Sequence, residues 1–304
     1  MSADPYDARV ALLLRVLPIV GRERDFALKG GTAINLFVRD LPRLSVDIDL
    51  TFLPLTDRDA ALDAIGTALK HITTAVPQAI EGSTVNASRR RDAPKLTISA
   101  SGAVIKVEPN TTLRGSVFEP AVRRTTAAVE AEFEQSVSVN VLSLADLYGG
   151  KLVAALDLQH PRDLFDVKLL LDEKGFTDDV RVAFVVYLAS HNRPMAELLD
   201  PKCKPLADVF KDEFAGMSRL KITAGELEDT RDQLIRQVQA DLTRKEREFL
   251  LSLKNGDPQW NLLPVRHIAQ MPAVRWKLHN IEQLTNRPKE HEAAVRKLRD
   301  VLKI

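Results

Sequence analysis

Two aspartates separated by one apolar residue, in the segment SVDIDLTF, constrain this chain more than any other feature. Side chains alternate faces along a β-strand, so Asp47 and Asp49 would point to one side while Ile48 and Leu50 enter a core. Two carboxylates in one small volume repel each other, and a divalent cation relieves that repulsion because it prefers hard oxygen ligands. The same pattern is also typical of a solvated strand face, so its meaning depends on the neighbouring segments.

The segment before the aspartates, FALKGGTAINLF, predicts a strand, a glycine turn and a short helix. Gly30 and Gly31 permit a tight turn with close approach to the backbone, and Thr32 can cap the helix. The start of a helix binds phosphate readily, because its N–H groups point at the anion. A diglycine alone is more often an ordinary turn. Together with the aspartates it indicates a nucleotide site, with Lys29 and Ser45 as weaker candidates for phosphate contact.

A third carboxylate follows in the segment AVIKVEPN, which has the alternation of a strand. This alternation places Glu108 and Lys106 on one face and the apolar side chains on the other. Glu108 would complete an acidic triad with the two aspartates, and such a triad would hold Mg²⁺ for the in-line displacement of a phosphoryl group. The competing interpretation is a solvated glutamate on an edge strand that Pro109 ends.

Further along, SLADLYGGKLVAALDLQHPRDLFDVKLLL predicts two helices with a break at the His-Pro pair. Pro161 suits the first turn of the second helix, on which Asp163 and Asp166 share a face. Asp166 lies in an apolar run, where a carboxylate is costly to bury without a partner, and Lys151 on the first helix is the obvious partner. A salt bridge that merely holds two parts of the fold together is the competing interpretation.

The order of these patterns predicts the domain organisation. A length of 304 residues favours two domains. Helix and strand patterns mix up to residue 140, whereas almost every later segment has the helical period. We therefore predict an α/β (α+β) fold, with a mixed-sheet lobe over residues 1–140 and a mostly helical lobe over residues 141–304. The sheet lobe would carry metal and nucleotide, and the helical lobe would close the cleft and receive the second substrate.

Charge and cysteine usage limit the class of protein. The formal net charge is +1, so any contact with RNA has to come from local basic patches. One such patch lies in residues 266–304, with nine Lys or Arg against four Asp or Glu, and another is Arg89–Arg91. The single cysteine fits a reducing compartment. No segment has the length and hydropathy of a membrane span, so we expect a cytoplasmic protein without a membrane partner.

The order apolar-GG, D-h-D-h and h-E-h, where h is any apolar residue, resembles the DNA polymerase β-like nucleotidyltransferase superfamily. More narrowly, LKGGTAINLF, RLSVDIDL and GGKLVAALDLQHPRDLFDVKLLL look like the AbiEii family of bacterial nucleotidyltransferase toxins, which includes the MenT toxins. The resemblance implies that Lys151 and Asp166, with Asp163 second, grip the nucleotide phosphates. Leu158 stands where relatives often carry an arginine, so Arg162 would have to compensate or the triphosphate would be held differently.

The resemblance also implies a reaction and its biological setting. A nucleoside monophosphate would pass from an NTP to an acceptor hydroxyl with Mg²⁺, and the acceptor would be RNA, in particular the 3′ end of tRNA, so that translation is blocked. A cognate antitoxin, often a winged-helix regulator, would accompany the toxin. Two alternatives remain: an acceptor hydroxyl on a small molecule or protein, or an inactive module that only binds nucleotide.

Overall fold

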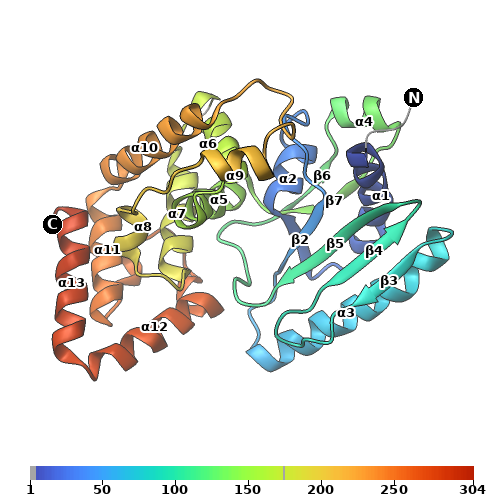
Figure 1. The fold of residues 1–304 in the computed structure, drawn as a ribbon. Coiled ribbons are helices and arrows are strands. Elements are labelled where there is room, and N and C mark those ends of the chain that lie inside the picture. Colours follow the sequence, from blue (N-terminus) through green and yellow to red (C-terminus); the bar gives the residue numbers. More distant parts are fainter. Residues whose placement is uncertain (1–4, 174) are drawn as a thin grey trace. The chain divides into compact units, whose positions relative to one another are not determined.

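The computed structural model describes residues 5–173 and 175–304, which form two compact units (Figure 1). The first unit contains the chain up to Ser143 together with Met217–Leu220, and the second contains Leu144–Gly216 and Lys221–Ile304. The predicted boundary after residue 140 falls inside the last strand of the first unit. After Gly216 the chain returns to the first unit for the segment Met217–Leu220. No sequence pattern predicts this return.

The first unit is built on a mixed seven-stranded sheet in the order β3-β4-β5-β2-β1-β7-β6. The pairs β2–β5 and β1–β7 are parallel, and all other neighbours are antiparallel. This mixed sheet confirms the predicted fold class. The strands are β1 (Phe26–Lys29), β2 (Asp47–Phe52), β3 (Thr84–Ala87), β4 (Leu96–Ala100), β5 (Ala103–Asn110), β6 (Ala121–Arg124) and β7 (Ser138–Val141).

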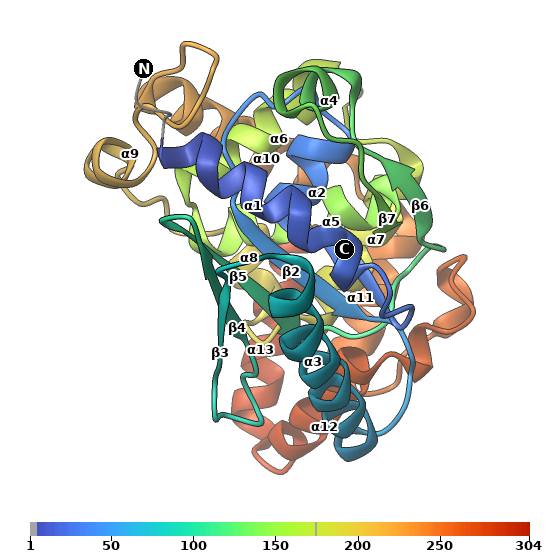
Figure 2. The same cartoon turned by 90° about the vertical axis from the view of Figure 1, so that its right-hand side faces the viewer.

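Helices cover one face of this sheet. Figure 2 shows α1 and α3 in front of the strands, and both helices pack against the sheet and against each other. Apolar strand residues such as Ile48, Val107 and Ile98 are fully buried. The helices of this unit are α1 (Pro5–Val20), α2 (Gly30–Phe37), α3 (Arg58–Ala79) and α4 (Ala127–Phe133).

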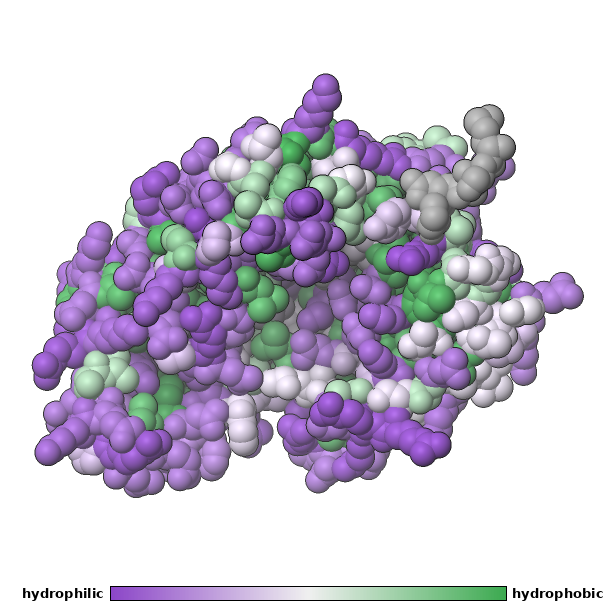
Figure 3. Space-filling model, in the orientation of Figure 1, coloured by the Kyte–Doolittle hydropathy of each residue, from purple (hydrophilic) through white to green (hydrophobic). Residues whose placement is uncertain are grey.

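The second unit is helical, as predicted, and α7 forms its centre. Nearly all side chains of α7 are buried, from Val180 to Ser190. The space-filling view shows mostly hydrophilic side chains over the outer helices α10 to α13 (Figure 3). No described helix of the chain is long and apolar enough to cross a bilayer. The helices are α5 (Leu144–Leu158), α6 (Pro161–Glu173), α7 (Asp178–Ser190), α8 (Met195–Leu199), α9 (Ala207–Glu213), α10 (Ala224–Asp241), α11 (Arg244–Asn255), α12 (Pro272–Thr285) and α13 (Pro288–Leu302).

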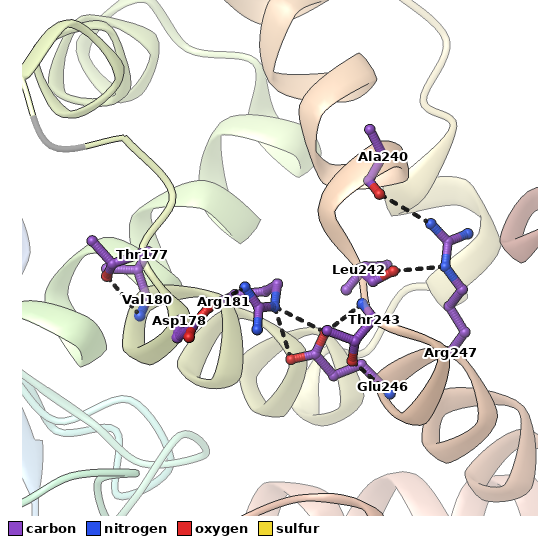
Figure 4. Close-up of polar contacts among 9 residues, drawn as sticks. All are labelled: Thr177, Asp178, Val180, Arg181, Ala240, Leu242, Thr243, Glu246 and Arg247. Atoms are coloured by element: carbon purple, nitrogen blue, oxygen red, sulfur yellow. Dashed lines mark hydrogen bonds and ion pairs between the residues drawn. The ribbon is translucent and has the colours of Figure 1, made fainter.

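A capping box fixes the start of α11 and ties it to α7 (Figure 4). The Thr243 side chain accepts the N–H of Glu246, whose carboxylate in turn accepts the Thr243 N–H at 2.7 Å. This carboxylate is almost fully buried, and it also accepts Nε of Arg181 at 3.0 Å. Arg181 reaches Asp178 in the first turn of α7 as well. A buried carboxylate is tolerated here because an arginine and a backbone N–H both satisfy it.

Glu130 on α4 gives the first unit a measurable acid sensitivity. Arg124 donates to both of its carboxylate oxygens at 2.7 Å, and the hydroxyls of Ser136 and Thr125 donate to one of them. These hydrogen bonds, with Arg124 the largest contributor, lower the pKa of Glu130 from 4.5 to about 2. A lowered folded-state pKa contributes stability that is present above pH 4.5 and is lost as the pH falls through about 2.

We therefore expect the melting temperature difference between wild type and Glu130→Gln to be largest near neutral pH. It should shrink between pH 4.5 and about 2. Glu81→Gln, at an exposed loop position, is the matched control and should show a pH-independent difference from wild type. A constant difference for Glu130→Gln over the same acid range would contradict the assignment.

Candidate active site

The register of two parallel strands brings the predicted carboxylates onto one face of the sheet. Asp49 lies opposite Glu108, and Asp47 lies opposite Lys106. Between these pairs, Ile48 lies opposite Val107, and both are fully buried on the helix-covered face. Because side chains on directly paired positions share a face, the three carboxylates lie on the side of the sheet opposite that core. Glu108 therefore does not face away from the aspartates.

Lys29 extends this polar row across a third strand. It lies opposite Asp49 in the antiparallel β1–β2 pair, so Lys29, Asp49 and Glu108 follow one another across β1, β2 and β5. The lysine is the last residue of β1 and the N-cap of α2. A cation next to the carboxylate row at a helix start is suited to an anionic ligand.

Gly30 makes the close approach between the turn and the carboxylate row. Its φ of +74° is a conformation that residues with a side chain rarely adopt. A Cβ at this position would lie only 2.5 Å from Oδ2 of Asp49. The first glycine is therefore required both by the backbone conformation and by the space that the aspartate occupies.

Gly31 faces a second group of polar side chains. A Cβ there would lie 2.6 Å from Nη2 of Arg43 and 2.8 Å from Oγ of Ser45. Thr32 is fully buried, contacts Ser45 Oγ at 3.0 Å and donates to the backbone oxygen of Asp47 at 2.6 Å. The expectation that Thr32 caps α2 is wrong, because the helix already begins at Gly30 and the hydroxyl binds the aspartate strand instead.

Arg43 is the site residue that sequence reasoning missed. Its side chain is only 3 % exposed, and Nη1 donates to the backbone oxygen of Leu44 at 2.9 Å. The returning segment Met217–Leu220 holds this stretch in place, because Leu44 N–H donates to Met217 at 2.9 Å and Arg219 N–H donates to Pro42 at 2.9 Å. The only sequence signal was an arginine between apolar residues, in PRLS.

The donor set on this face suits Mg²⁺ in its chemistry, since carboxylate oxygens are the ligands that hard divalent cations prefer. Across the described parts of the chain, no three His, Cys, Asp or Glu side chains stand close enough together to hold a metal ion. Oε1 of Glu108 lies 3.6 Å from Nζ of Lys95. Assembling the triad around a cation would therefore need side-chain rotations, including that of Glu108 away from Lys95.

In the second unit, Lys151 joins both candidate aspartates of α6. Its Nζ lies 2.7 Å from Asp163 and 3.1 Å from Asp166. Asp166 is fully buried and Lys151 is 9 % exposed, so the predicted pairing of the buried carboxylate with this lysine is confirmed. Removing either partner would leave an uncompensated buried charge, which is far costlier than an exposed one.

The helix that carries Lys151 is itself held tightly. Asp146, five residues earlier on α5, accepts the hydroxyl of Tyr187 at 2.7 Å. Burial, followed by the charge of Asp146, raises the pKa of Tyr187 well above its ordinary value, so the phenol remains a donor. Gly149 allows α5 to approach α7 very closely, because a Cβ there would lie 2.7 Å from that of Ala183.

Leu158, which stands where relatives of this family often carry an arginine, is the last residue of α5. Leu158 is 60 % exposed. Arg162, the residue expected to compensate, lies 3.8 Å from Glu213, which also accepts from His160 at 3.0 Å. Arg162 is thus directed to a carboxylate within the second unit.

Comparisons with known proteins identify the family and the fold. A family model described as "Nucleotidyl transferase AbiEii toxin, Type IV TA system" matches residues 11–280. The chain belongs to the AbiEii family of nucleotidyltransferase toxins. The resemblance drawn from the sequence motifs is therefore confirmed. Family membership makes this AbiEii chain a nucleotidyltransferase toxin of a type IV toxin–antitoxin system, with a nucleotide substrate and a cognate antitoxin.

A solved structure shares the fold over almost the whole AbiEii chain. It is MenT4, a nucleotidyltransferase toxin from Mycobacterium tuberculosis, with a TM-score of 0.61 and 15 % sequence identity. The match covers 93 % of this chain and 94 % of that one. At this identity the likeness concerns the fold. A search of curated proteins found no match.

Proposed function

We propose that this AbiEii protein transfers a nucleoside monophosphate from an NTP to an RNA acceptor, at the 3′ end of tRNA, with Mg²⁺, and thereby blocks translation. The observation that carries the proposal is the row of Asp47, Asp49 and Glu108 on one sheet face beside the Gly30 turn. Metal-assisted phosphoryl transfer requires acidic side chains that hold the metal and backbone donors that position the phosphates.

Residues of the first unit have distinct roles in this proposal. Asp47, Asp49 and Glu108 would hold the metal, which when bound neutralises the charge that develops on the phosphoryl oxygens. The Gly30–Gly31 turn, the start of α2 at Thr32, the Ser45 hydroxyl and Lys29 would bind the NTP phosphates, because donors and positive charge converge there. The Thr32 hydroxyl, which donates to Asp47, would hold the Ser45 hydroxyl in place. Arg43 lies against the same turn and would orient these hydroxyls or meet the phosphates.

The reaction then follows in one displacement. The acceptor hydroxyl oxygen forms a bond to the α-phosphorus as the bond between that phosphorus and the pyrophosphate oxygen breaks. The hydroxyl proton passes to a carboxylate, for which Glu108 is the candidate, and pyrophosphate leaves with the bonding electron pair. Lys151, Asp163 and Asp166 are assigned to nucleotide binding by the family resemblance, and this assignment remains a prediction.

The biological setting is proposed from the family. A cognate antitoxin, of which a winged-helix regulator is one form, would neutralise the toxin. The reaction would take place in the cytoplasm, where tRNA is found. The basic residues of 266–304 and Arg89–Arg91 are local sources of positive charge for an RNA backbone.

Labelled NTPs incubated with the purified protein and total RNA test this function. We expect label in the tRNA fraction, dependence on Mg²⁺, and loss of label with EDTA or in Lys151→Met. Each of the four NTPs is supplied separately, so the preferred base is read from the same experiment. Label on protein or on small molecules alone would instead support a different acceptor, and nucleotide binding without any transfer would support an inactive binding module.

A further inference from the structure

A cavity of about 200 Å³ opens in the first unit between α3 and the β3–β4 hairpin. Figures 1 and 2 show α3 running alongside these strands. Its floor is apolar and comprises Leu62, Leu69 and Leu96, each of which is itself well packed. This volume is below the roughly 300–1,000 Å³ of sites for drug-sized ligands, so it suits one flat group and not a whole ligand.

A helical glycine lines this cavity. Gly66 lies in the middle of α3 on the lining, and a Cβ built there would meet no atom within 4 Å. Glycine inside a helix costs about 0.5–1 kcal/mol relative to alanine, so this position weakens α3 without any packing reason for it. The space above Gly66 is where a group from outside can enter.

Cations surround the mouth of the cavity, and two of them are available to a ligand. Arg90 pairs with Asp92, and Arg91 pairs with two aspartates of α3. Within the residues that the structure describes, the side chains of Lys70 and Arg89 form no ion pair or hydrogen bond. An apolar floor can bury the flat face of an unstacked base, and cations at the rim attract its phosphates.

Lys95 links the cavity to the carboxylate row, which lies on the face of the sheet away from α3. Lys95 lines the cavity and its Nζ lies 3.6 Å from Oε1 of Glu108. The same loop is tied to the end of β5, because the hydroxyl of Thr111 donates to the backbone oxygen of Asp92 at 2.9 Å. An RNA strand bound at the cavity would reach Glu108, on the other face of the sheet, by passing around the 88–95 loop at Lys95.

We propose that this cavity binds one unpaired base of the acceptor RNA, with adjoining phosphates on Lys70 and Arg89. The inference rests on the proposed RNA acceptor and adds a docking site to it. The base enters over Gly66 and lies on the leucine floor, and the following nucleotides run past Lys95 toward Glu108. A single-stranded end fits this arrangement because its bases are exposed, whereas paired bases in a duplex are not.

The test measures binding of a fluorescein-labelled single-stranded oligoribonucleotide to the full chain by fluorescence anisotropy. Gly66→Leu fills the cavity, and Gly66→Ala is its control because one methyl group leaves the space open. We expect about tenfold weaker binding for Gly66→Leu, which corresponds to about 1.4 kcal/mol of lost apolar burial of the base, and binding within twofold of wild type for Gly66→Ala. Both variants should melt no lower than wild type, because both remove a helical glycine.

The contribution of rim charge to RNA affinity is tested separately with Arg89→Gln. The control is Arg22→Gln, at an exposed arginine of the same unit outside this cavity. Arg89→Gln should weaken binding several-fold and reduce the slope of log K against log salt by about 0.7. Crosslinking of a labelled NTP should be unchanged in every variant.

The possible outcomes distinguish failure of the cavity proposal from failure of the proposed reaction. Equal RNA affinity for Gly66→Leu and Gly66→Ala, or no binding of the oligoribonucleotide by wild type, overturns the cavity proposal. The expected binding pattern without transfer of label to RNA supports the cavity and overturns the proposed reaction. Loss of NTP crosslinking together with RNA binding in Gly66→Leu also overturns the proposal, because a substitution in an RNA cavity should leave the nucleotide site intact.

Discussion

Asp49→Asn is expected to lower the rate of nucleotidyl transfer by about 10³-fold or more. Asparagine keeps the size and shape of the side chain, so it fits against Gly30 where the carboxylate lies now. It removes the negative charge that a divalent cation needs. A bound metal supplies several kcal/mol of charge stabilisation, and each 1.36 kcal/mol corresponds to about tenfold in rate.

Initial rates of label transfer at saturating Mg²⁺ measure this effect. Asp40→Asn is the matched control, since it makes the same substitution at an exposed position of the same unit, and it should transfer at the wild-type rate. Thermal melting of both variants checks that the fold is retained. A rate for Asp49→Asn within about threefold of wild type would show that this carboxylate does not hold the metal.

Gly149→Ala is expected to destabilise the second unit by about 3 kcal/mol. The new Cβ would lie 2.7 Å from Cβ of Ala183 and 2.8 Å from the backbone nitrogen of Phe184. Backbone atoms cannot rotate away as a flexible side chain can, so α5 and α7 would have to separate. Overpacking of a dense core typically costs about 1–3 kcal/mol, and a clash with backbone lies at the upper end.

The neighbouring glycine provides the control for this prediction. A Cβ at Gly150 would meet no atom within 4 Å. Gly150→Ala should therefore stabilise α5 by about 0.5–1 kcal/mol, through the better helix propensity of alanine. Urea unfolding of both variants gives the two free energies. Similar values for the two substitutions would contradict the close approach of α5 to α7.

Patterns that depend on local geometry were predictable from the sequence. The alternation in DIDL and IKVEP placed Asp47, Asp49 and Glu108 on the faces where the strands carry them. The burial of Asp166 followed from its apolar neighbours, and its pairing with Lys151 followed from the cost of a buried charge. The mixed sheet and the family were likewise evident from motif order and period.

Features that depend on distant segments were not predictable. The neighbours of Thr32 in the sequence predict a helix cap, whereas in the fold its hydroxyl donates to the backbone oxygen of Asp47 and contacts Ser45. Arg43 gave no pattern of its own, and its place beside Gly31 depends on the return of Met217–Leu220 to the first unit. The sequence favours Asp166 over Asp163 as the partner of Lys151, yet Asp163 lies nearer to Lys151.

By itself, the sequence determined which faces of its strands and helices are polar, because side-chain direction follows the backbone period within a few residues. This periodicity placed Asp47, Asp49 and Glu108 in one acidic row and buried Asp166, and the order of the motifs indicated the family. Only the tertiary structure decided the register of β2 against β5, the buried arginine at the glycine turn, and the cavity above Gly66. These three features arise from contacts between segments far apart in the chain, and such contacts leave no periodic signal in any one of those segments.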